Sequence, residues 1–102
     1  MEVNILAEEK PTTLTLADGK EYEIPVLNLT TLANMEKTMG FGLGKLGEKM
    51  LEEPATTMRL EIYALLKETY PKLKLEEVGK LITFDVMQNI ADVLSKVMSI
   101  AG

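Results

Sequence analysis

The stretch Thr13–Val26, which reads TLTLADGKEYEIPV, decides how the chain begins to fold. Its apolar residues alternate with polar ones on both sides of the central Asp18-Gly19 pair. A period of two is typical of strands that bury one face, and an Asp-Gly pair suits a tight turn with a positive φ angle. The stretch therefore predicts a β-hairpin over residues 13–26, with an apolar face made of Leu14, Leu16, Tyr22, Ile24 and Val26. Because Pro25 cannot donate to a ladder, the second strand is expected to be an edge there or to end there.

From Asn28 onward the spacing of apolar residues changes to three and four, which is typical of amphipathic helices. We expect Thr30 or Thr31 to cap a first helix that Gly40 ends. The same reasoning predicts four more helices: a short one closed by Glu52-Glu53-Pro54, one from Thr56 or Thr57 to Tyr70-Pro71, one over 75–82, and one over 84–101 capped by Thr83. The sequence thus predicts an α+β, predominantly α-helical fold: an N-terminal arm over residues 1–11 and a single domain over 12–102, with the hairpin at 13–26 and the helical part at 30–101.

The last predicted helix, residues 84–101, carries two apolar stripes side by side. One stripe contains Phe84, Met87, Ala91, Leu94 and Met98, and the other contains Val86, Ile90, Val93, Val97 and Ile100. Together they cover more of the helix than one face of a small core requires. Either this helix is central and surrounded by the other elements, or one stripe packs inward while the other meets a partner protein. If a partner is met, we expect the contact at Val86, Ile90, Val93 and Val97.

Composition excludes several classes of function. The chain of 102 residues has no cysteine, histidine or tryptophan, and eleven Lys and Arg against sixteen Asp and Glu give a net charge of −5. No basic stripe is present that could replace counterions along a nucleic acid, so we expect no nucleic-acid binding. The sequence also has no apolar run long enough to span a membrane and no secretory signal pattern, so we expect a cytoplasmic protein without a membrane partner.

No residue pattern in the chain indicates catalysis, and we predict that the protein is not an enzyme and has no catalytic, metal or cofactor-binding residue. Without His or Cys, the remaining nucleophiles have no evident activating neighbour. Gly42, Gly44 and Gly47 formally match a dinucleotide-binding fingerprint, but the segment before them has a helical pattern rather than that of a strand. A phosphate loop would need Ser or Thr after Lys45, where Leu46 stands. The glycine-rich segment is therefore interpreted as a helix stop and a connection.

Methionine is frequent, and six of the seven methionines fall beyond the initiator at helical apolar positions. Flexible and polarizable methionines fill cores, and they are also over-used on surfaces that accept varied apolar partners. Met35 and Met39 on the first helix are therefore further candidates for partner binding, beside their more ordinary role in the core.

Four segments of the chain resemble, in type and order, the tail assembly chaperones of long-tailed bacteriophages and gene-transfer agents. These segments are Leu14–Tyr22, Leu32–Glu36, Leu60–Leu66 and Leu75–Ile82, which read LTLADGKEY, LANME, LEIYALL and LEEVGKLI. The resemblance implies a non-enzymatic chaperone that shields an apolar, helical tape-measure protein before the tail tube assembles. It implies no catalytic motif, in agreement with the analysis of the residues.

Two other classes of function fit the same sequence. One is a small structural tail or connector subunit that self-assembles through the hairpin edge, since a lone hairpin leaves backbone groups unpaired. The other is an acidic regulatory adaptor. The unpaired edge also leads us to expect a homo-oligomer.

Overall fold

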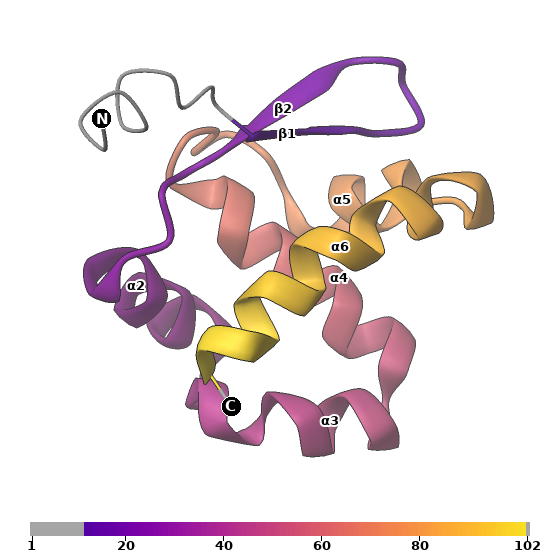
Figure 1. The fold of residues 1–102 in the computed structure, drawn as a ribbon. Coiled ribbons are helices and arrows are strands. Elements are labelled where there is room, and N and C mark those ends of the chain that lie inside the picture. The colour runs from indigo at the N-terminus through magenta and orange to yellow at the C-terminus, as the bar shows by residue number, and fades with distance from the viewer. Residues whose placement is uncertain (1–11, 102) are drawn as a thin grey trace, which may run out of the picture.

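The structure, a computed structural model, describes the backbone of residues 12–101 and the side chains of residues 13–95. The predicted arm over residues 1–11 lies outside this part of the chain. The element order is β1 (Thr12–Thr15), β2 (Glu21–Ile24), α2 (Leu29–Met39), the 3₁₀-helix η1 (Leu43–Lys45), α3 (Leu46–Glu52), α4 (Pro54–Lys67), α5 (Leu75–Leu81) and α6 (Phe84–Ala101) (Figure 1). The predicted α+β, predominantly helical fold with an N-terminal hairpin and five α-helices is therefore confirmed for the described residues.

The hairpin forms where the alternating pattern predicts it. Its strands pair antiparallel with Leu14 opposite Tyr22, and Gly19 in the turn has a φ angle of +81°. The Asp18 carboxylate steadies this turn by accepting a hydrogen bond from the Lys20 N–H at 3.1 Å. The inner face is buried at Leu14, Leu16, Tyr22 and Ile24.

The prediction for Val26 was wrong, because its side chain is 74% exposed. The strand ends at Ile24, directly before Pro25, so the alternation no longer decides which way residue 26 points.

Helix α2 begins two or three residues earlier than predicted. Asn28, not Thr30 or Thr31, is the N-cap, and its side-chain oxygen accepts a hydrogen bond from the Thr31 N–H at 2.9 Å. The helix ends at Gly40, as the sequence predicts, because this residue adopts a left-handed φ of +87° that other residues rarely adopt.

Helix α4 also begins earlier than predicted. Pro54 was interpreted as closing the preceding helix, but it occupies the first turn of α4. This position needs no backbone donor, so proline is favoured there. Helix α6 begins at Phe84, and the N–H groups of Val86 and Met87 both donate to the Thr83 carbonyl at 3.0 Å.

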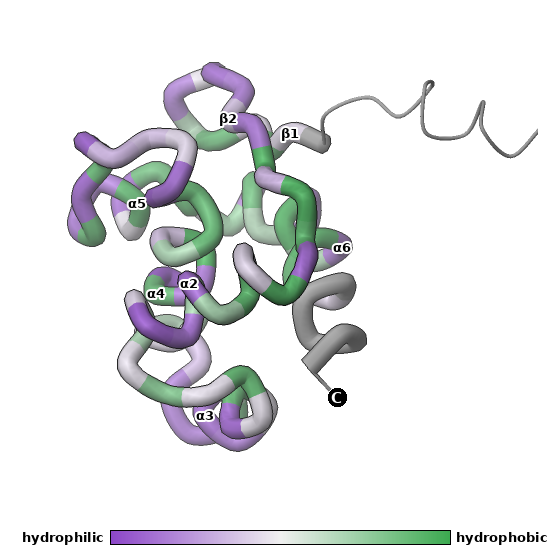
Figure 2. The backbone as a smooth tube through the Cα atoms, turned by 90° about the vertical axis from the view of Figure 1, so that its left-hand side faces the viewer, coloured by the Kyte–Doolittle hydropathy of each residue, from purple (hydrophilic) through white to green (hydrophobic). Residues whose placement is uncertain are grey.

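All described elements contribute to one hydrophobic core. Helix α4 contacts α2, α3, α5 and β2, whereas α6 contacts β1, α3 and η1. In Figure 1 α6 crosses in front of α4, and the hairpin lies above both helices. Ile62, Leu65 and Leu66 of α4 and Ile90 of α6 are completely buried between these elements. Figure 2 shows hydrophilic residues gathered at the turn of the hairpin and hydrophobic ones along the inner parts of the helices.

Candidate partner-binding surface

The residues singled out for partner binding lie in the core. Val86, Ile90 and Val93 are 8%, 0% and 7% exposed, and Met35 and Met39 are likewise buried. In this conformation these five side chains pack inside the chain's own core and form no exposed surface, and their binding to a partner stays a prediction. The reason for this burial is that α6 packs on β1, α3 and η1 with Val86, Ile90 and Val93 turned inward. In the same way α2 packs on α4 with Met35 and Met39 turned inward, so the fold itself uses these apolar faces of α6 and α2. The Val97 side chain lies outside the described residues.

The other apolar stripe of α6 is divided between core and surface. Leu94 is buried, whereas Met87 is half-buried and Ala91 is exposed. Phe84, the first residue of the helix, is 86% exposed. A large aromatic side chain in water is informative when it lies beside other apolar surface, because such patches mark interaction sites. Among the described side chains of α6, residues 84–95, the large exposed apolar one is thus at the N-terminal end.

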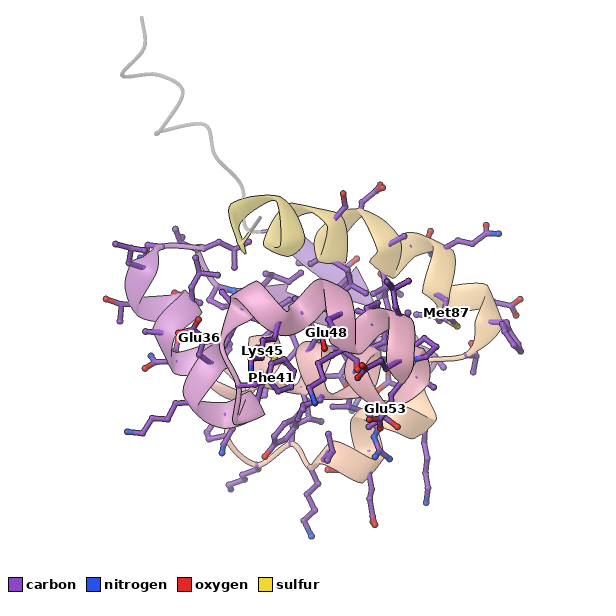
Figure 3. The ribbon with its side chains drawn as sticks, turned by 90° about the horizontal axis from the view of Figure 1, so that it is seen from below. Glu36, Phe41, Lys45, Glu48, Glu53 and Met87 are labelled. Carbon is purple, nitrogen blue, oxygen red and sulfur yellow. The ribbon has the colours of Figure 1, made fainter. Side chains whose placement is uncertain are left out.

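A pocket of about 260 Å³ lies beside this end of α6. Three helices form it, and its lining consists of Ala55, Thr56, Met58 and Arg59 from α4, Gly79 from α5, Ile82 from the following turn, and Met87 from α6. Two methionines and an isoleucine give it an adaptable apolar wall. Figure 3 shows Met87 at the end of the molecule that also holds Glu53, opposite Glu36 on α2. The pocket can accept an apolar side chain from outside.

Arg59, the sole arginine of the chain, lies in this pocket. Its side chain crosses α5 at Gly79, where a Cβ atom would stand 2.7 Å from Arg59 Cδ and 3.4 Å from Arg59 Cγ. A residue larger than glycine would therefore displace the arginine. The Nε atom of Arg59 is buried and has no hydrogen-bond partner within the described part of the chain. This unpaired donor is unusual, since most buried polar groups are paired.

Glu61 is the second buried polar group without a partner. It lies on α4 among completely buried leucines, it is 0% exposed, and neither carboxylate oxygen has a hydrogen bond within the described part of the chain. Burial disfavours the charged form, so the pKa of Glu61 rises from an ordinary 4.5 to about 7. Glu61 does not line the pocket described above. Its effect is on stability.

A second, more open hollow of about 440 Å³ lies between the hairpin and the segment after α4. Tyr22 and Tyr70 meet there edge to face with ring centroids 5.2 Å apart. The Tyr22 hydroxyl donates to Asp18 at 2.7 Å, and the Tyr70 hydroxyl accepts from the Glu23 N–H at 2.8 Å. The hydrogen bond to Asp18 raises the pKa of Tyr22 to about 12, so Tyr22 stays protonated. This arrangement attaches β2 to the helices and presents no activated group.

The glycine-rich segment is a connection in the structure. Gly42–Gly47 follows helix α2 rather than a strand, and it contains η1 and the first two residues of α3. The Glu36 carboxylate accepts a hydrogen bond from the Leu43 N–H at 2.8 Å, so an anionic group of the chain itself already binds this backbone. Lys45 is exposed. The geometry is that of a helix stop followed by a short turn.

Within residues 12–101, no group of three or more His, Cys, Asp or Glu side chains is arranged to hold a metal ion. None of the helices in that range is long and apolar enough to cross a membrane. Comparisons with protein-family models, with characterised proteins and with solved structures find no match to this chain.

The sequence identifies some residues in and near the pocket one by one, but not that they lie together. Phe84 and Met87 belong to a stripe that periodicity identifies, and Arg59 is conspicuous as the one arginine among eleven basic residues. The proximity of Arg59 and Met87 to Met58, Gly79 and Ile82 depends on how α4, α5 and α6 pack. No local pattern specifies that packing.

Proposed function

We propose that this chain is a non-enzymatic assembly chaperone that binds an apolar, helical segment of another protein at the pocket between α4, α5 and α6. The observation that carries the proposal is a pocket lined by Met58, Ile82 and Met87, together with the exposed Phe84 three residues before Met87 on α6. An amphipathic helix could place one apolar side chain in the pocket and a neighbouring one against Phe84. In keeping with the resemblance to tail assembly chaperones, the proposed partner is a tail tape-measure protein.

The size of the pocket supports binding of a segment rather than of a cofactor. Small-molecule sites usually enclose ~300–1,000 Å³ and surround most of the ligand. At about 260 Å³ this pocket holds one or two apolar side chains. The acidic net charge of −5 would keep a chaperone of this kind soluble while its partner's apolar face is covered.

Co-expression with a long apolar tail protein encoded beside this chain tests the proposal. We expect the chain to keep that protein soluble, and we expect Met87→Glu to lower the affinity at least about tenfold, because the new carboxylate replaces apolar wall and occupies the place beside Arg59. Gln88→Glu is the matched control, since it adds the same charge at an exposed neighbouring position of α6. Binding is measured by titration calorimetry with the purified variants. Equal affinities of Met87→Glu and Gln88→Glu would contradict the proposal.

A structural subunit that self-assembles is the second candidate. The sheet has two strands, so each strand has an outer edge, and the Glu23 N–H on the β2 edge is already bonded to Tyr70. The edge of β1 is neutral, with Thr13 and Thr15 exposed, and is the more suitable of the two for pairing with a second copy. Self-assembly of this kind depends on β1 and not on Met87. An oligomer that persists in Met87→Glu, together with no binding of the tail protein by the unaltered chain, would favour it.

A further inference from the structure

The pocket beside α6 contains a cation as well as apolar walls. Arg59 is a half-buried side chain that lines it, and the close approach of Gly79 holds this side chain against α5. Its Nε is covered by protein and has no hydrogen-bond partner within the described residues, so the charge of the guanidinium is not paired through this atom. A ligand that brings an acceptor to the guanidinium from the pocket gains a charge-assisted hydrogen bond.

The chemistry of the acceptor follows from that of arginine. The guanidinium is always charged at physiological pH, and its planar, forked donors match the two oxygens of a carboxylate. Met58, Ile82 and Met87 surround this fork with apolar surface, which strengthens the pairing by lowering the local dielectric. A ligand that matches both features has an apolar group and a carboxylate a few ångströms apart.

We propose that the pocket selects a partner segment in which an apolar side chain lies next to a carboxylate, with Arg59 as the residue that determines this specificity. The inference rests on the proposed function, because it names the chemistry that the same site recognises. The net charge of −5 makes the site selective for the position of the carboxylate. A carboxylate of the partner placed at the Arg59 guanidinium is attracted by its positive charge, whereas a carboxylate elsewhere on the surface is repelled by the acidic side chains of this chain.

Alkyl probes of equal chain length distinguish binding of the apolar group from binding of the carboxylate. Octanoate, octanol and octylammonium are titrated at pH 7 into the full chain, and the amide signals of Gly79 and Met87 are followed by NMR. We expect all three to bind at the pocket, and we expect octanoate to bind about tenfold more tightly than octanol, the effect of one hydrogen-bonded charge pair. Octylammonium is expected to bind most weakly.

Two variants assign this preference to Arg59. In Arg59→Met the preference for octanoate over octanol is expected to disappear while octanol binding persists. Lys80→Met is the matched control, because it removes one exposed positive charge from α5 without touching the pocket, and it should retain the tenfold preference.

Any other result of these titrations would contradict either the role of Arg59 or the pocket itself. Equal affinities for octanoate and octanol in the unaltered chain would refute the role of Arg59 and leave the apolar site of the proposed function standing. Absence of binding by every probe would refute the pocket itself, and the proposed function with it.

Discussion

Val93→Glu is expected to unfold the protein or to lower its free energy of unfolding by about 4 kcal/mol or more. Val93 is 7% exposed and belongs to the same core as Ile90 and Leu14. A carboxylate at this position would be buried without a partner, and an isolated buried charge costs several kcal/mol. Since small domains are stable by only ~5–15 kcal/mol, this substitution removes a large part of the total.

A thermal melt followed by circular dichroism measures the effect. Ser95→Glu is the matched control, because Ser95 is exposed two residues further along α6 and should leave the melt nearly unchanged. A cooperative melt of Val93→Glu close to that of the unaltered chain would mean that Val93 is not in the core. The alternative from the sequence, that Val86, Ile90 and Val93 face a partner, would then stand.

The second large effect concerns pH and Glu61. The folded state holds the proton of Glu61 more tightly than the unfolded chain does, with a pKa of about 7 against an ordinary 4.5. A group with a raised folded pKa contributes its stability below the unfolded value, and the contribution is lost as the pH rises through the folded value. We therefore expect the free energy of unfolding to fall by about 3 kcal/mol between pH 4.5 and pH 8 through this group alone, given that one pKa unit is ~1.4 kcal/mol.

Glu61→Met isolates this contribution. Methionine fills a similar volume and has no charge, so we expect the variant to be about 3 kcal/mol more stable than the unaltered chain at pH 8 and to lose most of the pH dependence. Glu52→Gln is the control, because it neutralises an exposed carboxylate at the end of α3. Urea unfolding at pH 5, 6.5 and 8 measures all three proteins. Parallel pH profiles for the unaltered chain and Glu61→Met would show that Glu61 is not the buried acid described here.

Much of the fold follows from local signals in the sequence. The Asp18-Gly19 turn, the alternation of Leu14 and Leu16, and the stop at Gly40 all appear in the structure as predicted, because each depends on a few neighbouring residues. The ends of the helices depend less on neighbouring residues alone. Both Thr30 and Asn28 can cap a helix, and the structure selects Asn28 because the strand before it ends at Ile24 and leaves room for a short connection.

The candidate site could be predicted only in part. The two stripes of α6 are equally apolar in the sequence, so periodicity cannot tell which one the hairpin and η1 cover. The structure buries Val86 and Ile90 and leaves Phe84 exposed. Glu61 had a readable signal that the sequence analysis missed: it lies four residues before Leu65, on the side of the helix that is otherwise apolar. The position of Arg59 against Gly79 is tertiary, and no spacing in the sequence predicts it.

Mapping a bound tail-protein segment by NMR tests the central claim most directly, because it locates the partner surface without altering the chain. The account predicts that the amide signals of Met58, Gly79 and Met87 shift on binding, while those of Thr13 and Thr15 on β1 do not. Shifts confined to the hairpin, with the pocket residues unchanged, would contradict it and would place the partner at the sheet edge.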